Sequence, residues 1–195
     1  MSVQLISSAA LERALNLRDL SDPLQGPHAM QQLVQMAHES LAKYWNCRRI
    51  VYRGCPLVSV KDNYDRLGYP PEGVVRDARY RRYVTLHMML RAHTSAMIPG
   101  LLRSISHELI EDLLLVCPGM VYRRDTIDRI HSAEPHHLDL WRISAGDQSL
   151  ESLERMIAIV VETLLPGYEY RTLSSRHHKR ITNRRSGWRS MGRNW

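Results

Sequence analysis

Apolar residues recur at helical spacing in two long stretches of the chain. The first stretch follows the Asp22-Pro23 and Gly26-Pro27 breakers and carries Gln, His, Glu and Lys between its apolar positions. Those positions are Met30, Leu33, Val34, Ala37 and Leu41. They predict an amphipathic helix that ends near Asn46. The second stretch, Gln148 to Leu165, is closed by Pro166-Gly167 and predicts a helix with one apolar stripe. The stripe comprises Leu150, Leu153, Ile157, Val160, Val161 and Leu164.

A strand and a loop are predicted after the first of these helices. Arg49 to Val60 is rich in β-branched and apolar residues, which predicts a strand interrupted at Gly54 and Pro56. Asn63 to Gly73 contains a Pro-Pro pair and several turn residues, which predict a loop.

The middle of the chain has one ambiguous element and one helix. The periodicity of Tyr83 to Leu90 is compatible with a strand or with a helix. Ser95 to Ser104 is predicted to be a helix that buries Leu101 and Leu102.

Strands follow in the second half. Leu113 to Cys117 and Met120 to Arg123 are predicted to be strands around a Pro118-Gly119 turn, and His136 to Ile143 is predicted to be their partner. Long helices on one side of meandering strands indicate an α+β fold, in which helices flank an antiparallel sheet.

The positive charge of the chain is concentrated at its end. The net charge is +7, but Arg171 to Trp195 holds eight Lys or Arg and no acid, which leaves the first 170 residues at −1. Charge alone therefore does not indicate that the main part of the chain binds nucleic acid. The tail interleaves arginines with Trp188 and Trp195, so one alternative is a basic RNA-binding module in which these rings stack on bases.

Length, hydropathy and cysteine usage favour a cytoplasmic domain. A chain of 195 residues, 44% of them hydrophobic, suffices for one domain with a substantial core. No apolar run reaches the roughly 18 residues of a membrane span, and the N-terminus lacks the pattern of a signal peptide. Cys47, Cys55 and Cys117 are an odd set without Cys-x-x-Cys spacing, which indicates neither disulfides nor a thiolate zinc site. We expect a reducing, cytoplasmic location and no membrane partner.

The stretch with the most chemical character is Val121 to His131, Val-Tyr-Arg-Arg-Asp-Thr-Ile-Asp-Arg-Ile-His. An apolar strand leads into an Arg-Arg-Asp corner, and the chain returns through His136 to Trp141. Guanidinium groups bind phosphate through two parallel hydrogen bonds, so this pair of segments and the loop between them could bind a nucleotide. Taken without the surrounding motif, Arg123 is more commonly a strand-end arginine paired with Asp125 or Asp128.

The same stretch resembles the second motif of class II aminoacyl-tRNA synthetases, specifically of the phenylalanine type. Arg91-Ala92-His93-Thr94-Ser95 resembles the family's His-Thr-Ser loop for the amino acid, and Asp62-Asn63-Tyr64-Asp65-Arg66-Leu67 precedes it in the family's order. The resemblance extends from about Asp22 to about His177. It implies a class II core and favours a strand for Tyr83 to Leu90.

The resemblance implies roles in ATP binding for three residues. Arg123 would bind the α-phosphate of ATP and stabilise charge that develops during adenylate formation. Asp125 would contact the adenine side and His131 the phosphates. For both of these, loop capping and solvated charge are the alternative.

Four further residues would contact the amino acid. His93 and Ser95 match the loop that meets this substrate, whereas His137 and Asp139 fall where the family has the glutamine and glutamate that hold the ammonium group. Aspartate keeps the charge but shortens the reach, and a histidine can be cationic near neutral pH. These departures, together with Pro135 in place of an aromatic residue, concern amino-acid specificity more than nucleotide binding.

The histidines of the chain also raise the question of a metal. His131, His136 and His137 are close in sequence, and His177 and His178 follow later. Strand alternation points His136 and His137 to opposite faces, so we predict scattered polar histidines and no metal site.

The resemblance implies a phenylalanyl-tRNA synthetase-like protein whose family reaction uses ATP with Mg²⁺, phenylalanine and tRNA, with a homo-oligomer as a possible state. No segment matches the family's third motif or its anticodon-binding domain, so we expect the chain alone to be incomplete or inactive. The alternative is a degenerate, non-catalytic paralogue that binds nucleotide, RNA or a protein partner. We assign residues 1–177 to a partial catalytic domain and 178–195 to a basic, disordered tail.

The tail changes composition abruptly after about Lys179, which predicts an out-of-frame reading of a longer gene. The tail has no acid and no apolar periodicity. Met191-Gly192 must be encoded with ATGG, which forces Trp in the shifted frame, whereas most other shifted residues depend on codon choice. The downstream DNA is then expected to encode the glycine-rich third motif with its arginine.

Overall fold

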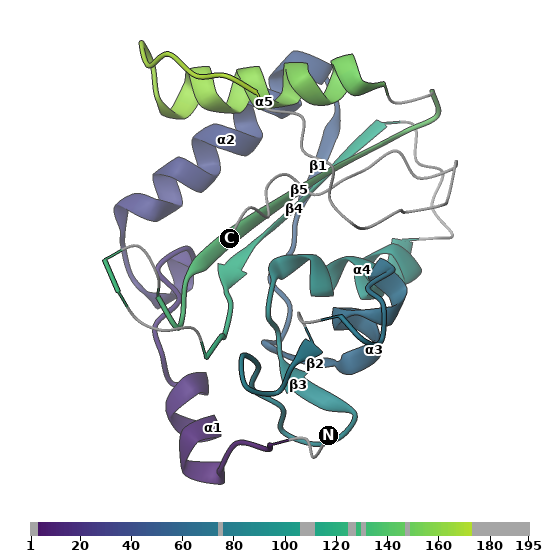
Figure 1. Cartoon of the computed structure of the whole chain (residues 1–195). Coiled ribbons are helices and arrows are strands. Elements are labelled where there is room, and N and C mark those ends of the chain that lie inside the picture. The colour runs from purple at the N-terminus through teal and green to yellow at the C-terminus, as the bar shows by residue number, and fades with distance from the viewer. Residues whose placement is uncertain are drawn as a thin grey trace.

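The main sheet has its strands in the order β1-β4-β5 (Figure 1). A computed structural model of the chain describes residues 4–73, 76–105, 112–124, 128–129, 132–146 and 149–172. β1 (Arg48–Val51) runs parallel to β4 (Asp112–Met120), and β4 pairs antiparallel with β5 (His136–Ser144). A smaller antiparallel sheet joins β2 (Leu57–Ser59) to β3 (Met88–Leu90). The α+β class is confirmed, with one parallel pair in a sheet that was predicted to be antiparallel.

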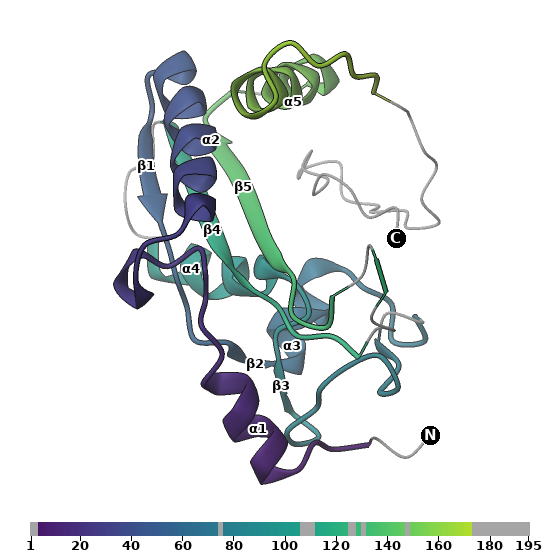
Figure 2. The same ribbon diagram turned by 90° about the vertical axis from the view of Figure 1, so that its left-hand side faces the viewer.

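Helices cover both faces of the main sheet (Figures 1 and 2). α2 (Ala29–Trp45) and α5 (Leu150–Leu164) pack against each other on one face, and α4 (Ile98–Ile105) covers the other. α2 and α5 confirm the two helices predicted from apolar periodicity. Asn46, with a φ of 49°, provides the left-handed residue that ends α2.

β4 is the central strand of the main sheet, and its side chains pack on both faces. Leu113, Leu115 and Cys117 belong to the core beneath α4, whereas Leu114 and Val116 belong to the core shared with α2 and α5. Every residue of β4 after its first is buried. The unbroken apolar run in this part of the sequence is typical of a strand that is covered on both sides.

The turn predicted at Pro118-Gly119 is wrong, because β4 continues through both residues. The amide of Met120 points away from β5 and donates to Asp19 (3.1 Å). Pro118 is two residues earlier and has the same orientation, at a point where β1 has already ended. Pro118 has no backbone N–H, but no hydrogen bond of the sheet is lost, because no strand of the described part of the chain lies beside it to accept one. A strand can therefore contain these two turn-forming residues.

The packed face of α5 differs from the predicted stripe. Met156 is buried in the core, and the partly buried Ile159 and Val160 pack against the same core; of these three, only Val160 was predicted. Leu150, which was placed in the stripe, is 71% exposed. α5 packs mainly against α2 rather than directly on the strands, and this contact determines which of its sides is buried.

Short elements connect the two sheets. β1 and β2 confirm the strand predicted to be interrupted at Gly54 and Pro56. A short helix, α3 (Val60–Asn63), follows β2, and a 3-10 turn, η2 (Asp65–Leu67), takes part of the predicted loop. Another 3-10 turn, η1 (Pro23–Gln25), precedes α2.

The segment that leads into α4 follows the sequence prediction in part. η4 (Thr94–Met97) and α4 together confirm the helix predicted from Ser95 to Ser104. Leu101 is buried, and Leu102 is partly buried against the same core. Of the ambiguous stretch Tyr83 to Leu90, only the last three residues form a strand.

α1 (Ser8–Leu15) was not predicted from the sequence. Ser7 caps this helix by accepting a hydrogen bond from the Ala10 amide (3.2 Å). The preceding residues are held to the body of the molecule, since the Ile6 amide donates to the Tyr83 carbonyl (2.8 Å). α1 and α5 lie at opposite ends of the molecule (Figure 2).

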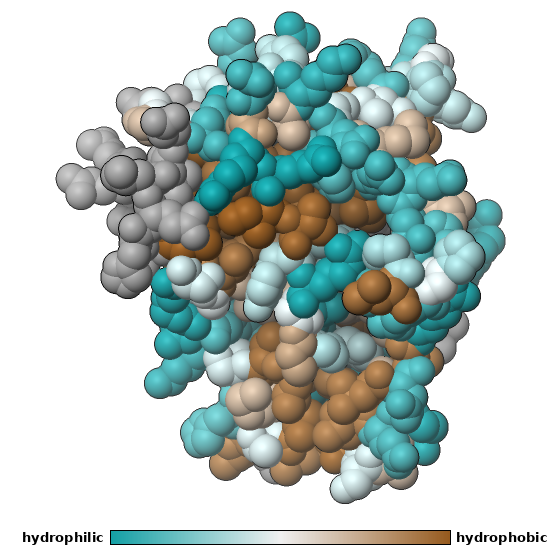
Figure 3. All heavy atoms as spheres, turned by 180° about the vertical axis from the view of Figure 1, so that it is seen from behind, coloured by the Kyte–Doolittle hydropathy of each residue, from teal (hydrophilic) through white to brown (hydrophobic). Residues whose placement is uncertain are grey.

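Apolar atoms reach the surface in two areas when the molecule is seen from behind, one over β1 and one over α1 (Figure 3). Val51 of β1 and Leu15 of α1 are among the large apolar side chains that are exposed. Among the described residues, no helix combines the length and the apolar character needed to cross a membrane. The predicted tail 178–195 and the domain boundary at 177 lie outside the described residues.

Candidate functional site

Arg123 lies just beyond the end of β4, in a segment that stays paired with the chain returning to β5. The Val121 amide donates to the Pro135 carbonyl (2.9 Å), and the Arg123 amide donates to the Ala133 carbonyl (2.8 Å). This ladder continues the β4–β5 pairing and fixes the direction of the Arg123 side chain. Its position at a strand end is the one predicted from the sequence.

The Arg123 guanidinium joins two of the predicted segments. Its Nε donates to the carbonyl of Ala92 (3.2 Å), directly before His93 in the His-Thr-Ser loop. Its Nη2 lies 3.5 Å from Nε2 of His137 on β5. The side chain is half-buried, so its charge acts in a medium that screens less than water. Segments about thirty and fourteen residues away thus converge on one cation.

His93 and Ser95 are both buried in the His-Thr-Ser loop. His93 stacks on Tyr69, with ring centroids 5.5 Å apart and planes inclined by 22°, and meets Tyr64 edge-on at 6.3 Å. Asn63, fully buried, accepts a hydrogen bond from the Ala92 amide (3.0 Å) through its Oδ1. These contacts hold the loop in one position next to Arg123.

His137 and Asp139 share one face of β5, because they are two residues apart on a strand. Their partners across the β4–β5 ladder are Gly119 and Cys117. Cys117 belongs to the core that includes Met97 of η4, so this is the face on which the His-Thr-Ser loop lies. Burial raises the pKa of the Cys117 thiol to about 12, and the nearby charge of Asp139 adds to this effect.

Arg91 is a buried cation behind the site, and the sequence reasoning gave it no role of its own. Its Nε donates to the Met120 carbonyl and its Nη1 to the Gly54 carbonyl, both at 2.8 Å. Burial lowers the pKa of its guanidinium from the ordinary value. A Cβ at Gly119 would collide with Nη2 of Arg91, so the strand needs glycine at this close approach.

Asp19 completes this buried network, and the sequence reasoning missed it. The Oδ2 atom of Asp19 accepts a hydrogen bond from the Met120 amide (3.1 Å) and lies 4.0 Å from Nη2 of Arg91. The Oδ1 atom accepts a hydrogen bond from the Ser21 hydroxyl (2.6 Å) and lies 3.3 Å from Nε2 of His136. Burial alone would raise the pKa of Asp19, but the contact with His136 and the hydrogen bonds from Ser21 and Met120 outweigh it and hold the pKa well below its usual range. Nothing in the local sequence distinguishes Asp19 from the other polar residues before α2.

The remaining predictions are placed less completely. Asp125 and His131 lie outside the described residues. His136 and His137 contact different partners, Asp19 and Arg123, as strand alternation predicted. Within the part of the chain that the structure describes, no three His, Cys, Asp or Glu side chains are grouped to hold a metal ion.

Known proteins with similar sequences are phenylalanine–tRNA ligases. The chain is 38% identical over 84 residues to the mitochondrial phenylalanine–tRNA ligase of Dictyostelium discoideum, an alignment that covers 43% of this chain and 17% of that protein. It is 35% identical over 78 residues to the phenylalanine–tRNA ligase alpha subunit of Lactococcus lactis subsp. cremoris (strain MG1363), which covers 40% of this chain and 22% of the subunit. The chain therefore spans less than a quarter of the length of these two relatives.

Similarity to solved structures concerns the fold. The crystal structure of pyrrolysyl-tRNA synthetase from Desulfitobacterium hafniense superposes with a TM-score of 0.52 at 15% sequence identity, over 80% of this chain and 53% of that one. A second structure of a pyrrolysyl-tRNA synthetase from the same organism gives a TM-score of 0.51, with 80% and 51% coverage. The sequence model of one family, described as tRNA synthetases class II core domain (F), matches residues 26–177. That match takes in both strands of the site and the loop between them, and the chain belongs to this family of class II tRNA synthetase core domains.

Proposed function

We propose that the chain acts as the core of a phenylalanyl-tRNA synthetase-like protein, which activates phenylalanine with ATP before transfer to tRNA. The proposal rests on the position of the Arg123 guanidinium, which donates to the carbonyl of Ala92 and lies next to His137. One cation thus stands between the loop predicted to meet the amino acid and the strand predicted to hold its ammonium group.

In this proposal, Arg123 binds the α-phosphate of Mg·ATP. The amino-acid carboxylate attacks the α-phosphorus, the bond to the pyrophosphate oxygen breaks, and an aminoacyl-adenylate forms. Charge builds on the non-bridging oxygens during this displacement, and a fixed guanidinium stabilises it without having to reorganise. Mg²⁺ enters with the nucleotide and shares the phosphate charge. Asp125 and His131 are proposed to contact the adenine side and the phosphates.

We assign the amino acid to the space near His93, Ser95, His137 and Asp139. Asp139 is half-buried on the same face of β5 as His137 and supplies a negative charge for the substrate ammonium group. His137, 3.5 Å from Arg123, meets this role best as a neutral imidazole, because a second cation there would repel both Arg123 and the ammonium.

The rest of the assembly is also part of the proposal. Relatives named as alpha subunits suggest that the chain works together with a second chain, and tRNA is the acceptor in the family reaction. A homo-oligomer is supported by the apolar residues exposed on β1 and α2, which include Leu33, Met36 and Val51. We expect it to work in the cytoplasm, although the Dictyostelium relative is a mitochondrial protein.

The test is amino-acid-dependent ATP–pyrophosphate exchange, measured with each of the standard amino acids. Exchange that depends on phenylalanine, and that falls by roughly a hundredfold or more in Arg123→Ala, supports the proposal, since one donor at a developing oxyanion typically contributes that much. Arg155→Ala, on the exposed side of α5, is the control for the loss of one charge.

The same assay separates the second candidate, a non-catalytic paralogue that binds nucleotide, RNA or a protein partner. The replacement of the family's glutamine and glutamate by His137 and Asp139 favours this candidate. If the chain binds ATP but supports exchange with none of the amino acids, the result identifies it as the non-catalytic paralogue. Exchange driven by a different amino acid would overturn the phenylalanine assignment.

A further inference from the structure

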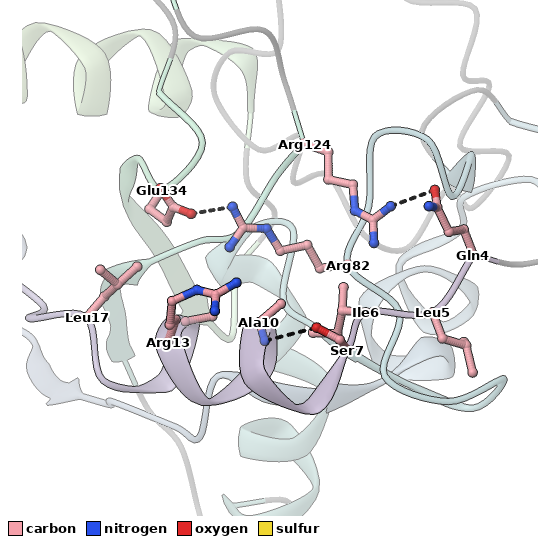
Figure 4. A pocket seen from close by; sticks show the side chains of 11 residues that line it. Gln4, Leu5, Ile6, Ser7, Ala10, Arg13, Leu17, Arg82, Arg124 and Glu134 are labelled. Atoms are coloured by element: carbon pink, nitrogen blue, oxygen red, sulfur yellow. Dashed lines mark hydrogen bonds and ion pairs between the residues drawn. The ribbon is translucent and has the colours of Figure 1, made fainter.

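A pocket of about 590 Å³ lies between α1 and the segments that carry Arg82 and Arg124 (Figure 4). Its apolar floor comprises Leu5, Ile6, Ala10, Ala14 and Leu17. The opposite wall holds the two guanidinium groups and the carboxylate of Glu134, and Arg13 lines the pocket from α1. We call this space the α1 pocket.

Positive charge exceeds negative charge in the α1 pocket. Arg82 forms an ion pair with Glu134, so these two charges balance. Arg124 donates from Nη1 to the neutral side-chain oxygen of Gln4 (2.8 Å). Arg13 makes no ion pair among the residues that the structure describes. Two guanidinium groups therefore line the pocket without an acidic partner in this part of the chain.

Both walls of the pocket are held in place by the backbone. On the α1 side, the Ile6 amide donates to the Tyr83 carbonyl (2.8 Å), and Ala14 is buried in a core that α1 shares with Leu90. On the opposite side, the Arg124 amide donates to the Tyr80 carbonyl (3.1 Å). A site whose walls are already fixed loses little entropy when it binds a ligand.

We propose that the α1 pocket binds a phosphate group through Arg13, Arg82 and Arg124. The planar guanidinium fork matches the geometry of phosphate oxygens, and an apolar floor reduces the screening of this attraction. The phosphate belongs to a small phosphate ester or to an RNA backbone, which present the same chemistry to the pocket.

The α1 pocket is separate from the proposed ATP site. Arg123 and Arg124 are consecutive residues, and their guanidinium groups point to different partners. Arg123 reaches the carbonyl of Ala92, whereas Arg124 reaches Gln4 in the N-terminal segment. The two sites thus lie on opposite sides of one extended segment.

The test is a titration of the full ¹⁵N-labelled chain with inorganic phosphate, followed by two-dimensional NMR. Replacing the two arginines that have no acidic partner among the described residues, in Arg13→Gln/Arg124→Gln, is expected to weaken phosphate binding at least about tenfold, because hydrogen bonds between charged groups are lost. Arg155→Gln removes one charge from α5, at the opposite end of the molecule, and should bind phosphate like the unchanged protein. Arg13→Gln alone changes one exposed side chain and tests the proposal if the double variant does not fold.

A second arm identifies the source of the phosphate. Binding of a labelled RNA oligonucleotide is measured by fluorescence anisotropy for the same variants. If the double variant loses affinity for RNA as well as for phosphate, the ligand is an RNA backbone. If it loses affinity for phosphate but not for RNA, the ligand is a small phosphate ester. Both results support phosphate binding in the α1 pocket.

Two results would overturn the proposal. The double variant could bind inorganic phosphate as tightly as the unchanged chain, or Arg155→Gln could lose as much affinity as the double variant. Arg123→Gln separates this proposal from the ATP site. If phosphate binding falls in Arg123→Gln and not in the double variant, the α1 pocket is excluded while the proposed function stands.

Discussion

β4 and β5 pair along their whole length, yet their surroundings differ. Every residue of β4 after its first is buried, whereas every residue of β5 is only half-buried. β4 lies between two strands, and β5 has no strand on its other side among the residues that the structure describes. Of the two strands, β4 therefore builds the core, and β5 carries the side chains that we propose to meet the substrate.

Two of the positions at which the sequence was predicted to depart from the family pattern lie on the less buried of the two strands. His137 and Asp139, the two altered positions predicted to meet the amino acid, both lie on β5. A half-buried strand tolerates a change of side chain with less loss of packing than a strand that is enclosed on both faces. β4 keeps an unbroken apolar run, and it meets the buried Arg91–Asp19 network through Gly119 and the backbone of Met120.

The largest expected effect comes from cavities on the two strands. Leu114 of β4 and Leu138 of β5 line the same core, but Leu114 is fully buried and Leu138 is half-buried. We expect Leu114→Ala to lower the free energy of unfolding by about 3–5 kcal/mol and Leu138→Ala by roughly half as much or less. Urea denaturation of both variants measures this difference. Equal losses would contradict the assignment of β4 as the core strand.

A smaller effect is expected at the point where β4 touches the buried network. Gly119→Ala forces a Cβ against the Arg91 guanidinium, which must shift away from the carbonyls that it binds. We expect a loss of about 1–3 kcal/mol in the free energy of unfolding, as for other overpacked sites. Gly146→Ala, just after β5, adds a Cβ in open space and serves as the control. A thermal melt in which both variants behave alike would show that Arg91 is not fixed by the strand.

The pH dependence of the free energy of unfolding tests Asp19, which belongs to the same buried network as Arg91. The pKa of Asp19 is lower in the folded chain than its ordinary value near 4, so the folded state binds fewer protons there than the unfolded state. The contribution of Asp19 is complete above pH 4 and is lost as the pH falls below it. Asp19→Asn is expected to flatten this part of the stability curve, measured by urea denaturation between about pH 2 and 6. A curve of the same slope in the variant would rule out Asp19 as the group responsible.

Elements with a clear period were predictable from the sequence, whereas those defined by long-range contacts were not. α2 follows its apolar pattern because one of its faces packs on the core. β5 forms where it was predicted, with Leu138 and Leu140 packed on one core and Trp141 and Ile143 on the other. The turn at Pro118-Gly119 was predicted wrongly, because the two residues favour a turn by their local conformational preferences. Pro118 can stay in the strand because β1 has already ended beside it, and the local sequence does not reveal where β1 ends. The buried face of α5 depends on its contact with α2, which no residue of α5 reveals.

The candidate site shows the same division. Arg123 was identified because it lies within a long motif, and the structure brings it to His137 and the carbonyl of Ala92. Asp19 was missed because a single aspartate in a polar stretch has no periodicity, and its partners are distant in sequence. Sequence order thus identifies the residues of a motif, while the charges that support the motif emerge only from the fold.

The most direct test of the proposed ATP site compares the two neighbouring arginines. Mg·ATP is titrated by calorimetry into the unchanged chain, Arg123→Gln and Arg124→Gln, which lose the same charge one residue apart. We predict that Arg123→Gln weakens ATP binding by roughly ten- to a hundredfold, because one charged hydrogen-bond donor to phosphate is removed. Arg124→Gln, on the other side of the segment, should leave ATP affinity unchanged. Equal ATP affinity in all three proteins, or a loss confined to Arg124→Gln, would contradict the placement of ATP at Arg123.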